Sequence, residues 1–175
     1  MKKIYTSLAA LLLHTSLLAQ APGTLDLSFG DNGIKTLNIG ESADMCWAAA
    51  RQPDGKILLA GRWDKGSGNK AMVLRLLANG ALDPVFGTRK IFVAGRSSTA
   101  YAIALQPDGK ILVAGETTVG TSSTADFFVA RLMPNGTADP NFGSPNGGYV
   151  VTDPSGLGQD DHANNILLQP DGKSC

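Results

Sequence analysis

The chain has 175 residues, of which 43% are hydrophobic and 17% charged, and its 15 basic residues equal its 15 acidic residues in number. This balance gives the surface no electrostatic attraction to nucleic acid, so we expect no nucleic-acid partner. Two cysteines, Cys46 and Cys175, are too few for a small fold that depends on disulfides.

The first 19 residues have the pattern of a secretory signal peptide. Two lysines precede an apolar stretch that runs to Leu18, and the small residue Ala19 stands before Gln20. The stretch is shorter than the roughly 20 apolar residues that a membrane-spanning helix needs, and no second such run follows. We therefore predict cleavage between Ala19 and Gln20, no membrane span, and a secreted or outer cell-surface location.

The first of two repeated sequence blocks is Gln-Pro-Asp-Gly-Lys followed by an apolar run that ends in Ala-Gly. It occupies residues 52–61 and 106–115, and it begins again at 169–173. Proline presets the first corner of a turn, aspartate suits the second, and glycine adopts the positive φ that follows. The block therefore predicts a β-hairpin in each unit. Its defining residues are Pro53, Asp54, Gly55, Pro107, Asp108, Gly109, Pro170, Asp171 and Gly172.

The second block contains Arg-Leu, then Asn-Gly, then a loop with the pattern Asp-x-x-Phe-Gly. It occupies residues 75–87 and 131–143, and its final part occupies 23–30. Because the arginine and the aspartate recur in register, we expect them to pair with each other as part of the scaffold. The residues that define this block are Arg75, Arg131, Asp26, Phe29, Gly30, Asp83, Phe86, Gly87, Asp139, Phe142 and Gly143.

Each unit is predicted to contain four short antiparallel strands, with the hairpin turn between the second and the third. The segments 91–93 and 149–151 are expected to form the first strand of the following unit. Four strands at this period are typical of a β-propeller blade. The predicted fold is therefore all-β, an incomplete propeller-type array of four-stranded antiparallel blades containing about two and a half repeats.

The expected divisions of the chain follow from the phase of the two blocks. The array should start with the end of a repeat, which we expect to pair with strands beyond Cys175. The divisions are the signal peptide at 1–19 and the repeats at 20–175, the latter split into a repeat end at 23–33, repeats at 34–87 and 88–143, and a truncated repeat at 144–175.

The strand before each turn predicts close packing between neighbouring blades. Strict alternation places Cys46, Ala48 and Ala50 on one face and Trp47 on the other. The second unit has alanine at all three of these small positions, and a face of small side chains lets another sheet approach closely. We therefore expect Cys46 to be a small buried residue rather than half of a disulfide with Cys175.

The repeats resemble those of the delta-60 repeat proteins, bacterial extracytoplasmic proteins with propeller-type repeats. The family signature is similar to residues 52–61 with 75–87 and to residues 106–115 with 131–143, while Ala138 replaces a leucine of the pattern. The resemblance covers nearly all of the chain after residue 19. It implies a fold and an extracytoplasmic location but no reaction.

The sequence contains no recognisable catalytic, cofactor-binding or metal-binding constellation. After signal removal His162 is the only histidine, and a triad would need a serine and a carboxylate beside it in space. Apart from Asp160 and Asp161, its sequence neighbours offer no such partner. The oxygen-rich segment 153–165 does not have the spacing of an EF-hand loop, so we interpret it as a solvated polar loop.

The connections between strands divide into a uniform set and a variable set. The variable ones are 40–44, 62–69, 95–99, 116–126 and 153–162. Because alternate loops of an up-and-down sheet emerge at the same end, we predict a uniform scaffold end and a second end that carries recognition.

The predicted function is a non-catalytic binding, adhesion or structural module. Its expected partner is an extracellular protein or glycan, and self-association through open blade edges is a further option. The alternative is a fragment of a β-propeller enzyme, a carbohydrate hydrolase or lyase, whose catalytic residues lie in other blades. A pair of non-recurring carboxylates facing the central channel would favour this alternative.

Overall fold

The computed structural model describes residues 22–39, 44–64, 68–91, 93, 96–119, 124–143, 147–154 and 158–169. Three predictions lie outside these residues: the signal peptide with its cleavage site between Ala19 and Gln20, the third turn at 170–172, and any role of Cys175.

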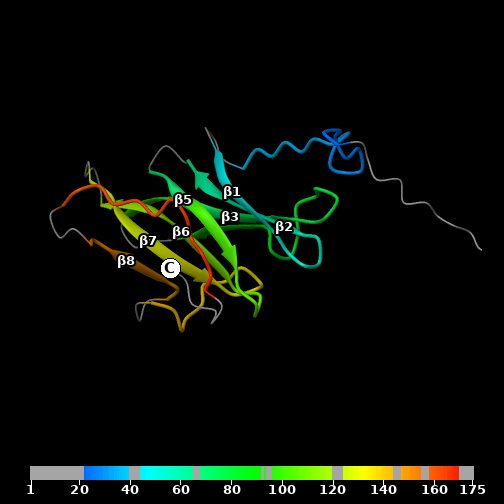
Figure 1. Cartoon of the computed structure of the whole chain (residues 1–175). Coiled ribbons are helices and arrows are strands. Elements are labelled where there is room, and N and C mark those ends of the chain that lie inside the picture. Colours follow the sequence, from blue (N-terminus) through cyan, green and yellow to red (C-terminus); the bar gives the residue numbers. More distant parts are fainter. Residues whose placement is uncertain are drawn as a thin grey trace, which may run out of the picture.

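The described residues form two four-stranded antiparallel sheets, which agrees with the predicted all-β class (Figure 1). In each sheet the strands pair in chain order. The first sheet consists of β1 (Met45–Arg51), β2 (Ile57–Trp63), β3 (Lys70–Leu76) and β4 (Thr88–Ile91). The second consists of β5 (Arg96–Leu105), β6 (Ile111–Val119), β7 (Asp126–Leu132) and β8 (Tyr149–Thr152).

The fourth strand of each sheet differs from the sequence prediction. We assigned the segments around β4 and β8 to the following unit, but β4 pairs with β3 and β8 pairs with β7. The reason is the Asp-x-x-Phe-Gly loop, which reverses the chain. In the first sheet the Gly87 N–H donates to the Asp83 carbonyl at 2.6 Å, and the next strand returns along β3. The hairpin turn therefore joins the first and second strands of a sheet.

The Pro-Asp-Gly turns fold as predicted at both described copies. The Gln52 N–H donates to the Lys56 carbonyl at 2.8 Å, and the corresponding bond from Gln106 has the same length. Gly55 and Gly109 have φ values of +85° and +82°, which glycine adopts without the steric cost of a side chain. These turns therefore fix the register of the β1–β2 and β5–β6 hairpins.

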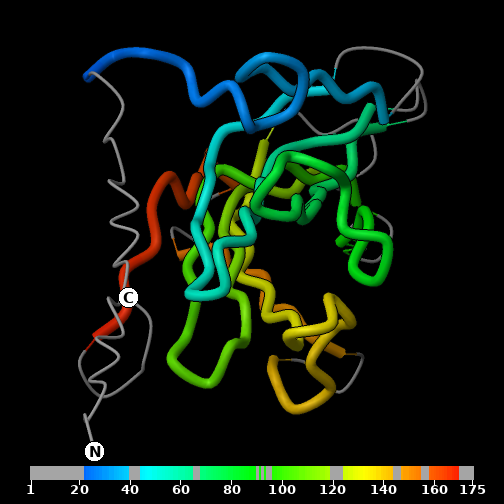
Figure 2. The backbone as a smooth tube through the Cα atoms, turned by 90° about the vertical axis from the view of Figure 1, so that its right-hand side faces the viewer, coloured from blue at the N-terminus to red at the C-terminus, as the bar shows by residue number. Residues whose placement is uncertain are grey.

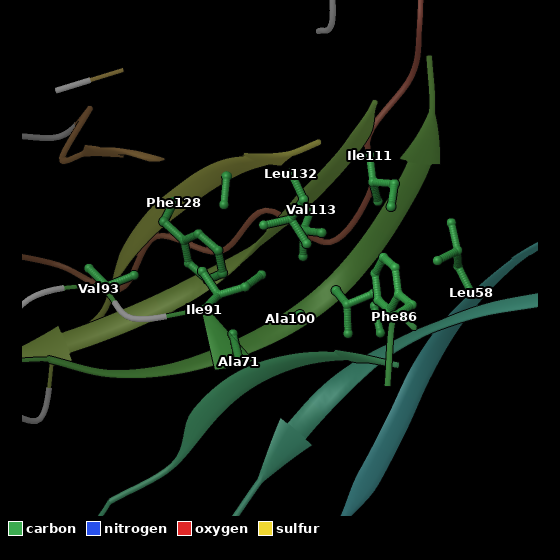
Figure 3. Packing of buried hydrophobic residues seen from close by; sticks show 13 residues of the cluster. Leu58, Ala71, Phe86, Ile91, Val93, Ala100, Ile111, Val113, Phe128 and Leu132 are labelled. Carbon is green, nitrogen blue, oxygen red and sulfur yellow. The ribbon is translucent and has the colours of Figure 1, made fainter. Parts of the chain in front are cut away.

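The main hydrophobic core lies between the two sheets (Figure 3). Leu58, Val73 and Phe86 from the first sheet and its β3–β4 loop are buried against side chains of the second sheet such as Ile111 and Phe128. Complete burial of one such side chain contributes roughly 1.5–3 kcal/mol. β5 contacts β1, β2 and β3, so the second sheet begins directly against the first.

The outward faces of the two sheets are partly covered by segments outside the strands (Figure 2). Phe29, Leu37 and Ile39 pack against the outward face of the first sheet. Ala163 and Ile166 pack against the outward face of the second sheet. Each sheet therefore presents one face to the other sheet and the opposite face to a flanking segment.

A β-bulge in the first strand of each sheet breaks the alternation that the sequence predicted. The pairing of β1 with β2 jumps from Cys46 opposite Gly61 to Ala48 opposite Ala60, so Trp47 has no direct partner. Cys46 and Ala48 consequently lie on opposite faces of the sheet. The same jump occurs in β5, around Tyr101. The prediction of one continuous face of small side chains is therefore wrong.

The predicted burial of Cys46 is also wrong, because this residue is a free, exposed cysteine. It lines an apolar groove of about 390 Å³ between the first sheet and residues 29–39. Desolvation by these surroundings raises the pKa of the Cys46 thiol. Ala100, at the equivalent position of the second sheet, is fully buried because its face of the sheet packs against the first sheet.

Candidate functional site

The recurring arginine and aspartate pair within the first sheet, as the sequence predicted. Arg75 Nε lies 2.9 Å from Asp83 Oδ2, and the Arg75 guanidinium stands 4.5 Å from the centre of the Phe86 ring. Asp83 Oδ1 also accepts the backbone N–H groups of Val85 and Phe86, at 2.9 and 3.3 Å. One carboxylate therefore ties the end of β3 to the loop that leads into β4.

The second sheet repeats this arrangement almost atom for atom. Arg131 Nε lies 2.8 Å from Asp139 Oδ2 and its guanidinium stands 4.6 Å from the centre of the Phe142 ring. Lys110 lies 3.6 Å from Asp139, as Lys56 does from Asp83. These side chains bind one another within the sheets, so we assign them to the scaffold and not to a functional site.

Electrostatics in the two loops favour the ionised aspartates. Burial opposes ionisation of Asp83, but the bonds from Val85, Phe86 and Arg75 outweigh it, and the pKa of Asp83 is lowered. The pKa of Asp139 is also lowered, chiefly by the backbone N–H of Asn141, whose effect exceeds the opposing effect of burial.

The Asp-x-x-Phe-Gly loop of one unit docks on the Asn-Gly turn of the next unit. A side chain at Gly136 would place its Cβ 2.7 Å from the Phe86 ring, and one at Gly80 would lie 3.1 Å from the Phe29 ring. Both glycines also have positive φ. Arg75 Nη1 extends the docking, since it donates to the Pro134 carbonyl at 2.9 Å. Recurring residues thus also hold successive units together.

A different set of side chains gathers near the bulges of β1 and β5. Trp47 and Tyr101 occupy the two bulges, and their ring centroids are 5.3 Å apart with an interplanar angle of 84°. The Arg62 guanidinium stands 5.7 Å from the centre of the Trp47 ring. Trp47 is nevertheless 43% exposed. The two sheets therefore join to present an aromatic pair whose Trp47 ring is accessible to solvent.

Two ionisable groups extend this cluster on the second sheet. Glu116 Oε2 lies 2.6 Å from His162 Nδ1, and Glu116 also accepts a hydrogen bond from the Tyr101 hydroxyl. Burial raises the pKa of Tyr101 to about 12, and the bond to Glu116 adds to the effect. We define the bulge cluster as Trp47, Arg62, Tyr101, Glu116 and His162.

The bulges depend on the glycine that ends each apolar run of the first block. A Cβ at Gly61 would lie 1.8 Å from the Met45 carbonyl oxygen, and one at Gly115 would lie 1.9 Å from that of Thr99. Only glycine therefore permits the close approach of the bulged strand. Arg62 and Glu116 directly follow these glycines, so the scaffold fixes where the variable charged residues appear.

The topology places the bulge cluster at the predicted recognition end. Connections alternate between the two ends of an up-and-down sheet, and the Pro-Asp-Gly turns and Phe-Gly loops share the opposite end. Arg62 and Glu116 lie near the ends of β2 and β6 that precede the variable connections. Scaffold residues and the bulge cluster are therefore separated along the length of the strands.

Comparison with known families gives these repeats an assignment. Residues 52–86 and 106–142 match the model of a family described as "Domain of unknown function (DUF5122) beta-propeller". The chain carries repeats of a β-propeller family. No curated protein matches the chain. Nor does the described part of the chain contain a helix with the length and apolar character to cross a membrane.

Sequence reasoning missed the partner of His162 in these β-propeller repeats. We considered Asp160 and Asp161, but Asp160 accepts the Ala125 N–H at 2.9 Å, and the Asp161 N–H donates to the Ala125 carbonyl at 2.7 Å. Glu116 is the partner instead. One signal could have identified it, because Arg62 and Glu116 are the first positions after the first block at which the two units differ in charge.

The oxygen-rich segment 153–165 is described by the structure at residues 153–154 and 158–165. Its Asp160 is bonded to backbone, and Asn165 Oδ1 accepts the Ile166 N–H at 2.8 Å. Within the described ranges, no group of three or more His, Cys, Asp or Glu side chains is arranged to hold a metal ion.

Proposed function

We propose that this protein is a secreted or cell-surface member of the delta-60 repeat proteins that acts as a non-catalytic binding module. Its binding surface is the bulge cluster, and its partner is an extracellular protein or glycan. The main support for the proposal is that scaffold residues and residues that differ between the units lie at separate places in the sheets. The residues that are identical in both units are engaged in the scaffold, whereas residues that differ between the units, such as Trp47 and Glu116, gather at one end.

The exposed indole of Trp47 supports a binding role. Tryptophan, tyrosine and arginine dominate the energetics of recognition surfaces because they bury a large area with few rotatable bonds. Here Tyr101 and Arg62 hold the indole in place before any ligand arrives. A surface that is ordered in advance loses less entropy on binding.

A fragment of a carbohydrate-cleaving enzyme is the alternative, and the Glu116–His162 pair is the observation that favours it. Glycoside hydrolysis ordinarily needs two carboxyl groups on either side of the scissile bond. The position that corresponds to Glu116 in the first sheet is Arg62, so the two sheets do not present a matched pair of carboxylates. This makes binding the better-supported function.

The test compares binding by the wild-type chain with two single variants. Binding to arrayed glycans and to immobilised extracellular proteins is measured for Trp47→Ala and for the control Val85→Ser. Val85 is 74% exposed in the β3–β4 loop at the opposite end of the sheets. We expect Trp47→Ala to lose binding and Val85→Ser to retain it. Equal binding by both variants would refute a site at the bulge cluster.

A second measurement separates binding from catalysis. Bound glycans are incubated with wild-type protein and with Glu116→Gln, and the products are analysed by mass spectrometry. We expect no cleavage by either protein. Cleavage by the wild type that is lost in Glu116→Gln would establish the enzymatic alternative.

A further inference from the structure

We infer that the ligand of the bulge cluster is a neutral carbohydrate, whose pyranose ring packs on Trp47 while its hydroxyl groups bond to Glu116 and His162. This inference rests on the proposed function and names its ligand class. It follows from three properties of the cluster: the shape of its apolar part, the kinds of hydrogen-bonding groups present, and the contacts that its ionisable groups already make.

The apolar part of the cluster is the Trp47–Tyr101 ring pair. Tyr101 meets Trp47 nearly edge to face, at 84°, and Arg62 stands 5.7 Å from the centre of the indole. With these neighbours in contact, 43% of Trp47 remains open to solvent. A pyranose presents a flat face of C–H groups, whose partial positive charge suits the negative face of an aromatic ring. The part of the indole that these neighbours leave open therefore suits the flat face of a sugar.

The polar groups beside this ring pair suit hydroxyl groups. Glu116 offers acceptor oxygens. His162 contacts Glu116 through Nδ1, so its second ring nitrogen, Nε2, lies on the side of the ring away from Glu116. A sugar hydroxyl is both a donor and an acceptor, so one sugar can use both kinds of partner. The side chains of Glu116 and His162 are 23% and 39% exposed, so solvent, and hence a ligand, can reach them.

The ionisable groups of the cluster already contact one another or an aromatic ring, which favours a neutral ligand over an ion. Glu116 has His162 Nδ1 at 2.6 Å and also accepts the Tyr101 hydroxyl. Arg62 lies against the indole and acts electrostatically on Tyr101. A charged ligand would have to compete with these interactions or leave one group desolvated without a partner, which is unfavourable. A neutral polyol requires neither change.

The first experiment uses the intrinsic fluorescence of Trp47. The chain has two tryptophans, so Trp63→Phe leaves Trp47 as the only reporter. This variant is titrated separately with neutral hexose oligosaccharides, a polyuronic acid and a lysine-rich peptide. We expect a saturable change in emission with a neutral oligosaccharide, at dissociation constants between about 1 µM and 1 mM, and none with the two charged ligands.

Titration calorimetry on single variants then tests which side chains contact the oligosaccharide. We expect affinity for the neutral oligosaccharide to fall at least about tenfold in Trp47→Ala, and about three- to tenfold in Glu116→Gln. Trp47→Phe should retain part of the affinity, and Val85→Ser all of it. Denaturation midpoints of these variants serve as the folding control, so a loss of affinity without a loss of stability is assigned to the site.

The outcomes separate this inference from the proposed function. If no neutral oligosaccharide binds up to about 10 mM, or if only the polyuronic acid or the peptide binds, the carbohydrate assignment is wrong. Should Trp47→Ala still lose capture of an extracellular protein, the binding function would stand with a different ligand. If no ligand depends on Trp47, both the inference and the proposed function fail.

Discussion

The two sheets share a sequence pattern but differ in what surrounds them. Phe86 in the first sheet is fully buried, whereas its counterpart Phe142 is only partly buried. The first strands show the reverse: Cys46 is exposed, and its counterpart Ala100 is inaccessible. The recurring residues therefore determine the contacts within each sheet. Packing against the neighbouring unit determines which face of the sheet is buried.

The contacts within one sheet, in contrast, are nearly the same in both sheets. The Arg–Asp distances are 2.9 and 2.8 Å, the Lys–Asp distances are both 3.6 Å, and the Arg–Phe distances are 4.5 and 4.6 Å. Changes to contacts within a sheet should consequently have equal effects in both units. Changes to contacts between sheets should separate the two units, and this difference can be measured.

The largest difference is expected between Phe86→Ala and Phe142→Ala. Phe86 belongs to the core between the sheets and contacts the turn at Gly136, so its removal leaves a cavity that cannot collapse. We expect Phe86→Ala to lower the free energy of unfolding by about 3–5 kcal/mol, and Phe142→Ala by about half of that. Urea denaturation of both variants provides the measurement. Equal losses would mean that burial between the sheets adds nothing to the contribution of this ring.

The next difference is expected between the two recurring arginines. The side chain of Arg75 is 9% exposed and that of Arg131 is 20% exposed, and Arg75 also donates a hydrogen bond to the Pro134 carbonyl of the next unit. Arg75→Ala would remove both the guanidinium beside the buried Asp83 and the bond to the next unit, at a cost of about 3–5 kcal/mol.

For Arg131→Ala we expect a smaller loss, about 1–3 kcal/mol, because solvent can partly replace the guanidinium. Denaturation curves compare the two variants, and the double variant Arg75→Ala/Asp83→Asn serves as the control. If this double variant were no more stable than Arg75→Ala, the charge left on Asp83 after removal of the guanidinium would not be the cause of the loss.

Much of each sheet could be predicted from sequence because the determining interactions are local. The Pro-Asp-Gly turns act through the φ preferences of individual residues, and the Arg75–Asp83 pair joins residues in a single block. Both were predicted, as was the four-stranded antiparallel arrangement. The outer strand was assigned to the wrong sheet, because a repeat read from sequence has no intrinsic starting strand.

The candidate site could not be predicted, because it depends on bulges and on contacts distant in sequence. A bulge reverses the facing of every residue beyond it, so the alternation from Cys46 to Ala50 gave the wrong faces. Gly61 carried the signal, but a glycine in a strand can have several causes. The approach of His162 to Glu116 requires the packing of one unit on another, which local propensities do not encode.

Acid should weaken the two sheets by similar mechanisms. The pKa values of Asp83 and Asp139 are lowered in the folded state, so the unfolded state binds more protons as pH falls through its own pKa of about 3.9. The stabilisation is therefore complete above about pH 5 and is lost progressively below about pH 4. Denaturation midpoints measured from pH 7 to pH 3 should show this decline.

Replacing either carboxylate should flatten the acid decline. Asp83→Asn and Asp139→Asn should each lower stability at pH 7 and reduce the further loss on acidification, by similar amounts in the two sheets. Val85→Ser should keep the full decline. A profile unchanged by Asp139→Asn would show that other carboxyl groups cause the acid sensitivity.

The smallest effect on stability is expected from cysteine labelling. This experiment compares the accessibility of position 46 in β1 with that of position 100 in β5. In a Cys175→Ser background, Cys46 should react with iodoacetamide in the native state, as followed by mass spectrometry. Because the pKa of Cys46 is raised, the reaction should be slow near pH 7 and should reach its full rate only at a pH higher than an ordinary thiol requires. In the variant Cys46→Ala/Ala100→Cys/Cys175→Ser, the new thiol would stand where the second sheet faces the first, and it should react only after denaturation. Equal native labelling at the two positions would mean that β5 is as accessible as β1, and the packing of the two sheets would have to be revised.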